Sequence, residues 1–326
     1  MAHITGHLRF VFFTLLIASL FASAPGMAQV VNGSFVGVVS DPSGGRLAGA
    51  QIVATNLSTG VSWTANTTHS GDYSLLSIPA GDYRLTVSSN GFKTTTIEKA
   101  HLQMQQTASI NITLAVGSVT QSVTVESVSP LLQTQTSDVG NVITAKQIAA
   151  MPLNGRDPLQ LATLEPGVNT FYSDAAAPSR GAVNFQGSNF LGGSQNVGSD
   201  ITVGDSREIS TQYRIDGINV TSPLVGQLTV LLSPDQIQEF KMEIGTAPAI
   251  YGTPQSLNML SKSGTNQFHG TAYEYYRSNN LDGFNYFQPK GVPAPLSFDQ
   301  FGGTVGGPLR TNKAFFFLGY EGLRSS

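Results

Sequence analysis

The sequence predicts a mainly β fold, and three observations support this prediction. Charged residues make up only 11% of the chain, which contains 35 glycines, and this composition is typical of exported β-rich proteins. In the first third of the chain, short runs of β-branched and aromatic residues alternate with turn residues. Near the C-terminal end, aromatic and polar residues alternate again over strand-length segments.

The composition excludes several classes of site. The net charge is −3 at pH 7, which does not favour nucleic-acid binding, because that needs clustered Lys and Arg. The absence of cysteine excludes disulfides, thiolate metal sites, a cysteine nucleophile and a lipoprotein anchor. We therefore expect no nucleic-acid partner and no cysteine chemistry.

The N-terminus is predicted to be a secretory signal peptide, residues 1–28. Residues 10–21 are apolar apart from Thr14 and Ser19, and small residues follow them. An apolar run of about a dozen residues is too short to cross a bilayer core of roughly 30 Å as a helix. We expect cleavage after Ala28, with an uncleaved membrane anchor as the alternative.

Residues 29–116 are predicted to form a small antiparallel β-sandwich. Turn residues such as those at 41–45 and 79–82 separate the predicted strands. The strands are expected at residues 35–39, 51–55, 61–65, 73–76, 83–87 and 109–114. Because side chains alternate between the two faces of a strand, Tyr83, Leu85 and Val87 should point into the core.

The strings GVVSDPSGGRLAGAQIVATN and SGDYSLLSIPAGDYRLTVSSNGF in this region resemble the carboxypeptidase regulatory-like domain. That resemblance implies a seven-stranded prealbumin-like sandwich and does not imply peptidase activity. After signal cleavage the histidines are His69, His101 and His269, which lack the short spacing of a zinc site. We expect them to be ordinary surface or turn residues, and we expect no metal and no cofactor.

Residues 131–263 are predicted to mix short helices and strands. A helix should span residues 144–152, with Thr144 as its N-cap and Pro152 as its stop, and a second helical turn should span residues 159–164. Residues 169–205 have no periodicity, so they are a candidate for ligand contact or a flexible spacer.

Two further features of this region are predicted from short patterns. Asp216 and Gly217 should form a two-residue hairpin turn, which makes Asp216 a turn residue rather than a catalytic acid. Lys241 and Glu243 lie two residues apart on a predicted strand and so share one face. Because charges alternate along that strand, we expect this face to be solvated or lumenal.

Residues 264–326 contain three alternating segments, at 270–277, 298–305 and 314–321. Outer-membrane barrel strands alternate an apolar lipid face with a polar lumenal face and carry aromatic girdles. These segments fit that pattern, and strands of an ordinary sandwich are the alternative.

The chain as a whole resembles the TonB-dependent outer-membrane receptors of the Oar type. The strings that carry the resemblance are MPLNGRDPLQLATLEPGV, YRIDGINV, SKSGTNQFHGTAYEYYRSNNLD and FGGTVGGPLRTNKAFFFLGYEGLR. The implied fold is an N-terminal prealbumin-like β-sandwich, then an α/β plug domain, then the first strands of an outer-membrane β-barrel. Residues 253–260 depart from the family pattern of paired glycines and a β-branched strand, which puts the packing of the last plug strand in doubt.

The resemblance also implies a TonB box, a short segment that pairs with TonB as an added strand. In the linker at residues 117–130, the residues that resemble this box are Val123, Thr124, Val125 and Glu126. The last strand of the sandwich and a plain linker are the alternatives. A complete barrel of this class has about 22 strands, so we expect this chain to be truncated early in the barrel.

The function implied by the resemblance is energised uptake across the outer membrane. The implied partners are TonB with its inner-membrane energising complex, outer-membrane lipid, and an extracellular ligand such as a glycan. The sequence contains no nucleophile–base or metal constellation, so we do not expect an enzyme. The alternative is a secreted β-sandwich protein for adhesion or carbohydrate binding.

Overall fold

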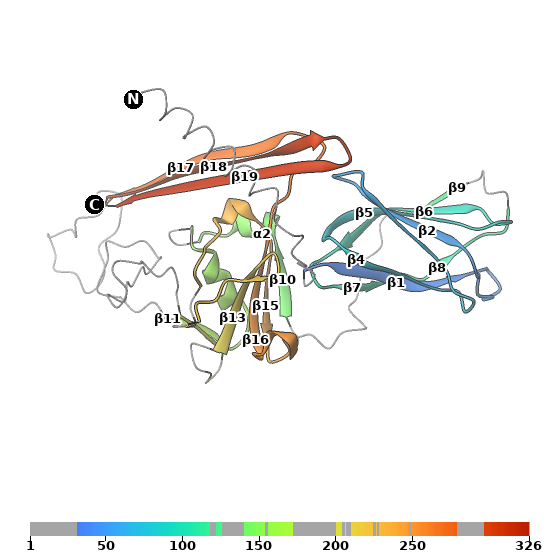
Figure 1. The fold of residues 1–326 in the computed structure, drawn as a ribbon, viewed down its shortest axis with the longest axis horizontal. Helices are drawn as coiled ribbons and strands as arrows, with labels where there is room; N and C mark the ends of the chain where they lie inside the picture. Colours follow the sequence, from blue (N-terminus) through green and yellow to red (C-terminus); the bar gives the residue numbers. More distant parts are fainter. Residues whose placement is uncertain are drawn as a thin grey trace, which may run out of the picture.

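The computed structural model describes residues 31–117, 122–125, 140–153, 156–171, 200–203, 206, 210–223, 226, 228–247, 249–278 and 297–325 (Figure 1). They form three units: a β-sandwich (the sandwich, residues 31–125), a mixed unit (the central unit, residues 140–261) and a three-stranded sheet (the C-terminal sheet, residues 269–325). No helix in these ranges is long and apolar enough to span a membrane. The predicted signal peptide lies outside the described residues.

The sandwich consists of two sheets that face each other across one apolar core. One sheet has the order β4-β1-β7, with β8 also paired to β1, and the other has the order β3-β2-β5-β6-β9. Tyr83, Leu85 and Val87 are buried, as predicted from the alternation. The strands are β1 (Gly33–Ser40), β2 (Gln51–Asn56), β3 (Ser62–Asn66), β4 (Asp72–Ile78), β5 (Gly81–Ser88), β6 (Thr94–Leu102), β7 (Thr107–Ser109), β8 (Ile112–Thr113) and β9 (Ser122–Val125).

The sandwich differs from the prediction in three respects. It is not wholly antiparallel, because β7 and β8 pair in parallel with β1, and β9 pairs in parallel with β6. The single strand expected at residues 109–114 is two short strands, because the side chain of Asn111 accepts a hydrogen bond from the Val38 N–H (3.0 Å) at the interruption. Strand β6 was not predicted at all. It lies between β5 and β9 and buries Ile97 and Leu102.

The central unit is built on a five-stranded sheet with the order β10-β15-β16-β13-β14, in which only β13 and β16 run parallel. One face of this sheet packs under the short helices through Ile148, Leu159, Phe240 and Met242. The elements are β10 (Gly140–Thr144), α2 (Ala145–Ala150), η2 (Pro158–Leu164), β11 (Val168–Phe171), β12 (Asp200–Val203), β13 (Thr211–Ile215), β14 (Ile218–Asn219), η5 (Pro234–Gln236), β15 (Ile237–Ile244), η6 (Ala249–Tyr251) and β16 (Gln255–Ser261).

The predicted helix boundaries are confirmed in the central unit. Thr144 is the N-cap of α2, where its backbone N–H donates to Gln147 Oε1 at 2.9 Å, and the helix ends before Pro152. The ends of the segment expected to be a loop are paired instead, because β11 and β12 form a two-stranded ladder. Residues 172–199 and 204–205, the rest of that ligand-contact candidate, lie outside the described residues.

The Asp216–Gly217 turn joins β13 to β14 as predicted. Both residues have positive φ, 50° and 80°, which is the geometry of a two-residue hairpin turn. The Asp216 carboxylate also accepts hydrogen bonds from the N–H of Ser261 (2.8 Å) and from its hydroxyl (2.7 Å). Asp216 therefore fixes the turn against the end of β16.

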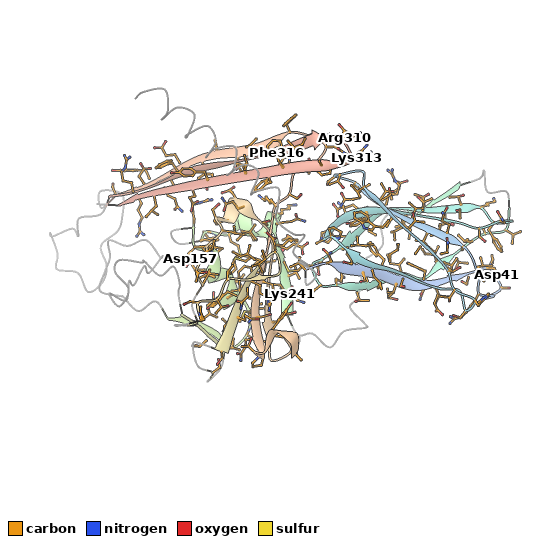
Figure 2. The ribbon with its side chains drawn as sticks, viewed as in Figure 1. Asp41, Asp157, Lys241, Arg310, Lys313 and Phe316 are labelled. Atoms are coloured by element: carbon orange, nitrogen blue, oxygen red, sulfur yellow. The ribbon has the colours of Figure 1, made fainter. Side chains whose placement is uncertain are left out.

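The C-terminal sheet is an antiparallel meander of β17 (His269–Ser278), β18 (Ser297–Arg310) and β19 (Ala314–Ser325). It extends along the central unit toward the sandwich (Figure 1). The turn between β18 and β19 is only three residues long, at 311–313. Arg310 precedes this turn and Lys313 is its last residue, at the end of the sheet nearest the sandwich (Figure 2).

Candidate functional site

Strand β15 carries three buried charged residues, and this contradicts the prediction of a solvated or lumenal face. The exposed fractions of Glu239, Lys241 and Glu243 are 2%, 1% and 0%. The opposite face of β15 packs in the core of the central unit, and the charged face is covered by a turn of the sandwich at residues 103–106. The alternating charged residues of β15 therefore form a buried polar layer.

Lys241 and Glu243 form a buried ion pair, with Lys241 Nζ 2.9 Å from Glu243 Oε1. The register of the sheet places Ser256 and Asn258 of β16 opposite them. The Ser256 hydroxyl (2.5 Å) and the Asn258 amide (3.1 Å) both donate to Glu243 Oε2. Buried charges are tolerated when their remaining hydrogen-bonding capacity is met in this way.

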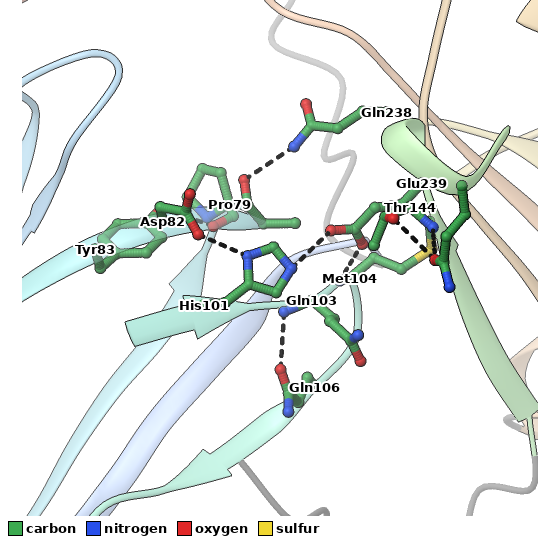
Figure 3. A network of polar contacts seen from close by, with 12 residues as sticks. Pro79, Asp82, Tyr83, His101, Gln103, Met104, Gln106, Thr144, Gln238 and Glu239 are labelled. Atoms are coloured by element: carbon green, nitrogen blue, oxygen red, sulfur yellow. Dashed lines mark hydrogen bonds and ion pairs between the residues drawn. The ribbon is translucent and has the colours of Figure 1, made fainter. Parts of the chain in front are cut away.

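The carboxylate of Glu239 is held from the sandwich (Figure 3). The Met104 N–H donates to Glu239 Oε2 at 2.7 Å, and His101 Nε2 lies 3.9 Å from Glu239 Oε1. His101 is held in turn by Asp82, with 2.8 Å between Nδ1 and Oδ1. Burial raises the pKa of Glu239, while the Met104 N–H, His101 and Lys241 each act to lower it.

A second polar cluster joins the central unit to the C-terminal sheet through Arg156. Its guanidinium contacts the Asp235 carboxylate and lies 4.4 and 4.5 Å from the ring centres of Tyr273 and Tyr275 on β17. Its Nε is 3.7 Å from Glu321 Oε2 on β19. Cation–π contacts of this kind are strongest where water is excluded.

Glu321 is the acceptor that ties the three strands to this cluster. It accepts from the Tyr273 hydroxyl (2.7 Å) and from the Gln300 amide of β18 (2.8 Å). No short-range pattern selects Arg156. The available signal is its position in the string LNGRDP, which belongs to the family resemblance.

Asp157, next to Arg156, gives the central unit a pH-dependent stability. It is 2% exposed and its Oδ1 accepts from the Leu159 N–H (2.9 Å) as the N-cap of η2. Burial raises its pKa from 3.8 to about 7. Because this pKa is higher in the folded than in the unfolded chain, the free energy of unfolding decreases as the pH rises from about 4 to about 7.

We expect Asp157→Asn, which keeps an acceptor oxygen for Leu159, to remove this decrease. Thermal unfolding of the chain at about pH 5 and about pH 8 would measure it, with the wild type losing stability between them and the variant losing less. Equal losses in the two proteins would show that Asp157 does not titrate in this range.

The other predicted site residues lie in two separate sheets. Val123, Thr124 and Val125 belong to β9, which pairs in parallel with β6 at the edge of the sandwich, from Thr94↔Ser122 to Ile97↔Val125. This is the sandwich-strand alternative left open by the sequence. Glu126 lies outside the described residues. Asp216 and Gly217 belong to the central sheet and act as a turn.

The described residues contain no group of three or more His, Cys, Asp or Glu that could hold a metal ion. The His101 ring is hydrogen-bonded to Asp82 and lies 3.9 Å from Glu239 Oε1, and the His269 ring is hydrogen-bonded to the Gln267 carbonyl. The polar clusters around Glu239 and Arg156 each join side chains of two units through charges and hydrogen bonds.

The two faces of the C-terminal sheet have different chemistry. Gln300, Tyr273 and Glu321 face Arg156 and the central unit. On the other face, Val305 lies opposite Leu318, and the side chains there are exposed. The large exposed apolar residues of this face include Phe301, Val305, Leu309, Leu318 and Tyr320. Glu274 is paired with Phe301 and Asp299 with Arg324 on this same face, so its apolar part lies around Val305 and Leu318. A polar inner face and an apolar band on the outer face fit an outer-membrane barrel wall.

Comparison with known proteins gives two domain matches. Residues 34–115 match the carboxypeptidase regulatory-like domain, and residues 260–326 match an outer membrane beta barrel domain. The chain is also 23% identical over 319 residues to the TonB-dependent transporter Oar of Myxococcus xanthus. That alignment covers 94% of this chain and 28% of the relative, so the chain spans a little over a quarter of its length.

Two solved structures resemble parts of the chain. The siderophore receptor PirA from Acinetobacter baumannii is 20% identical with a TM-score of 0.41, over 57% of this chain and 24% of that one. A protein described as carbohydrate-binding from Bacteroides uniformis is 17% identical with a TM-score of 0.23, over 26% of this chain and 41% of that one.

The order of these matches agrees with the order of units in the fold. The regulatory-like domain match falls on the sandwich, and the barrel match begins at the end of β16 and covers the C-terminal sheet. The relative with a known role aligns across all three units. The two domain matches and the relative therefore support a TonB-dependent receptor, with a carboxypeptidase regulatory-like domain ahead of the part that resembles the receptor.

Proposed function

We propose that this chain is part of an outer-membrane receptor that takes up an extracellular ligand with energy delivered through TonB. The central unit acts as the plug, and the C-terminal sheet forms the first strands of the barrel wall. The observation that carries this proposal is the Arg156 cluster, which joins a polar inner face of the sheet to the central unit. The opposite face carries exposed apolar side chains around Val305 and Leu318, and these suit contact with lipid.

TonB is proposed to capture residues 123–126 on the periplasmic side. In the chain this segment precedes β10, which is the edge strand of the central sheet and pairs only with β15 among the described strands. A pull on residues 123–126 therefore reaches the plug first at β10. Removal of β10 would open the sheet next to Glu239, Lys241 and Glu243 of β15, which are paired with residues of β10.

The same proposal accounts for export and assigns the chain no bond-making chemistry. A signal peptide at residues 1–28 would direct the chain to the periplasm and the outer membrane. Uptake by plug displacement needs no nucleophile or metal, so the proposed role is transport rather than catalysis. The ligand, of which a glycan is one class, would enter from the extracellular side.

Binding to the periplasmic domain of TonB tests this function directly. We expect the purified chain to retain that domain in a pull-down, and a synthetic peptide that spans residues 118–130 to compete for it, because added-strand recognition depends on the extended segment itself. A scrambled peptide of the same composition is the control. No retention of TonB by the chain would contradict the proposed capture.

A further inference from the structure

The structure assigns the sandwich a role as an intramolecular cap, which docks on the plug strand β15 and on Asn266 beside the β18–β19 turn, and which stabilises the closed plug. The docking surface is the turn at residues 103–106 together with His101 and the Ala80 carbonyl, which accepts from the Gln238 amide of β15 at 3.4 Å. Its partner is the polar face of β15. The docking itself is independent of TonB, and only its consequence for transport rests on the proposed function.

The first observation is that Glu239 depends on the sandwich for its partners. Its carboxylate is 2% exposed, and the contacts to its two oxygens are the Met104 N–H and His101. A carboxylate buried without hydrogen-bonding partners is strongly unfavourable. The central unit therefore tolerates Glu239 at this position because Met104, itself fully buried, lies against it.

The second observation is the conformation of Gln105. It has a positive φ of 57°, which is uncommon for a residue other than glycine and marks a constrained backbone. The turn is closed beneath it, since the Gln103 N–H donates to Gln106 Oε1 at 2.8 Å. In this conformation Gln105 contacts the central unit twice, accepting from Lys241 Nζ (3.3 Å) and donating to the Tyr251 hydroxyl (2.7 Å).

The third observation is a separate contact with the C-terminal sheet. Asn266, just before β17, donates its N–H to the Ser58 carbonyl (3.0 Å) and its side-chain amide to the Thr59 carbonyl (2.8 Å). The same side chain is paired with Asn312 in the turn between β18 and β19. Short turns of outer-membrane barrels lie on the periplasmic side, so the cap lies at the end of the plug where TonB acts.

The cap and the candidate TonB box share one sheet. Strand β9 extends the sandwich sheet through β6, and β6 ends at Leu102, directly before the docking turn. A pull on residues 122–125 therefore acts on the sandwich as well as on the plug. The sandwich therefore leaves β15 before the plug opens or at the same time. Its departure exposes the buried charges of Glu239, Lys241 and Glu243 to water, which weakens the closed plug.

Hydrogen exchange of the whole chain, without TonB, tests the docking. In Glu239→Ala the Met104 N–H loses a charged acceptor, and we expect peptides that contain residues 103–106 to exchange about tenfold faster or more. Glu98→Ala is the matched control, because Glu98 is a carboxylate of β6 in the sandwich that pairs with Arg84 and is partly exposed. It should leave exchange at residues 103–106 unchanged.

A second variant reports from the other side of the interface. Gln105→Ala removes the contacts to Lys241 and Tyr251 and should accelerate exchange in peptides from β15, while β1 and β5 remain protected as a check that the sandwich is folded. Unchanged exchange across the interface in both variants would overturn the cap. A chain that keeps the cap but fails to retain TonB would instead count against the proposed function alone.

Discussion

Replacing Val123, Thr124 and Val125 with proline is expected to abolish capture of the periplasmic domain of TonB by this chain. Recognition by strand addition uses backbone hydrogen bonds of the captured segment, and proline has no N–H to donate. A pull-down with the purified TonB domain would measure the loss. The matched control is the triple alanine variant, which keeps all three donors and should retain most of the binding.

The structure adds a second expected effect of the proline variant. Since β9 pairs with β6, the same prolines should release β9 from the edge of the sandwich and increase hydrogen exchange in β6. The alanine variant should leave this exchange nearly unchanged. Binding of TonB by the proline variant at the wild-type level would show that the captured segment lies elsewhere in the chain.

Replacing Lys241 with methionine is expected to lower the free energy of unfolding by about 3–5 kcal/mol. The substitution leaves Glu243, which is fully buried, without its positively charged partner. Breaking a buried pair costs much more than removing both charges, because the remaining charge is left uncompensated. Urea denaturation of the whole chain would measure the change.

The double variant Lys241→Met with Glu243→Leu is the informative comparison. Removing both charges from a buried pair is often close to neutral, so we expect the double variant to be more stable than the single one. Ser256 and Asn258 would lose their acceptor on Glu243, so we expect the double variant to recover only part of the lost free energy of unfolding. Equal stability of the single and double variants would mean that the two charges are not coupled.

Much of the fold could be predicted from short-range patterns. The strands around Tyr83, the helix that Thr144 caps and the turn at Asp216 all depend on residues close together in the sequence. Strand β6 could not be found in the same way. Its pairing with β5 shifts register between Tyr83 and Leu85, and this irregularity interrupts the alternation of buried residues along Thr94–Leu102.

The polar layer on β15 could not be predicted, because its burial comes from far away in the chain. Met104 and Gln105 contact it from 135 and 136 residues before Glu239 and Lys241. A strand with alternating charges has the same sequence pattern whether water or a second domain covers it. The sequence did mark one part of this site: residues 253–260 depart from the family pattern, and they contain Ser256 and Asn258, the donors to Glu243.

Arg156 was missed for a different reason. Its partners come from η5, β17 and β19, which are brought together only when the C-terminal sheet lies along the central unit. Aromatic residues at alternate positions in β17 predict that they share one face of the sheet. They do not predict which cation will contact that face. Long-range contacts of this kind follow from the assembled fold.

The position of β10 at the edge of its sheet has a mechanical consequence. The strand is five residues long and enters the sheet at Gly140, which is paired with Glu243. The backbones are so close there that an added Cβ would lie 2.5 Å from the Met242 carbonyl oxygen. Tension along the chain from residue 139 acts on this pair before it acts on the others. The pairs between β10 and β15 would then separate one after another, from Gly140 to Thr144. Because each pair breaks separately, a small force acting over a long distance is enough to open the sheet.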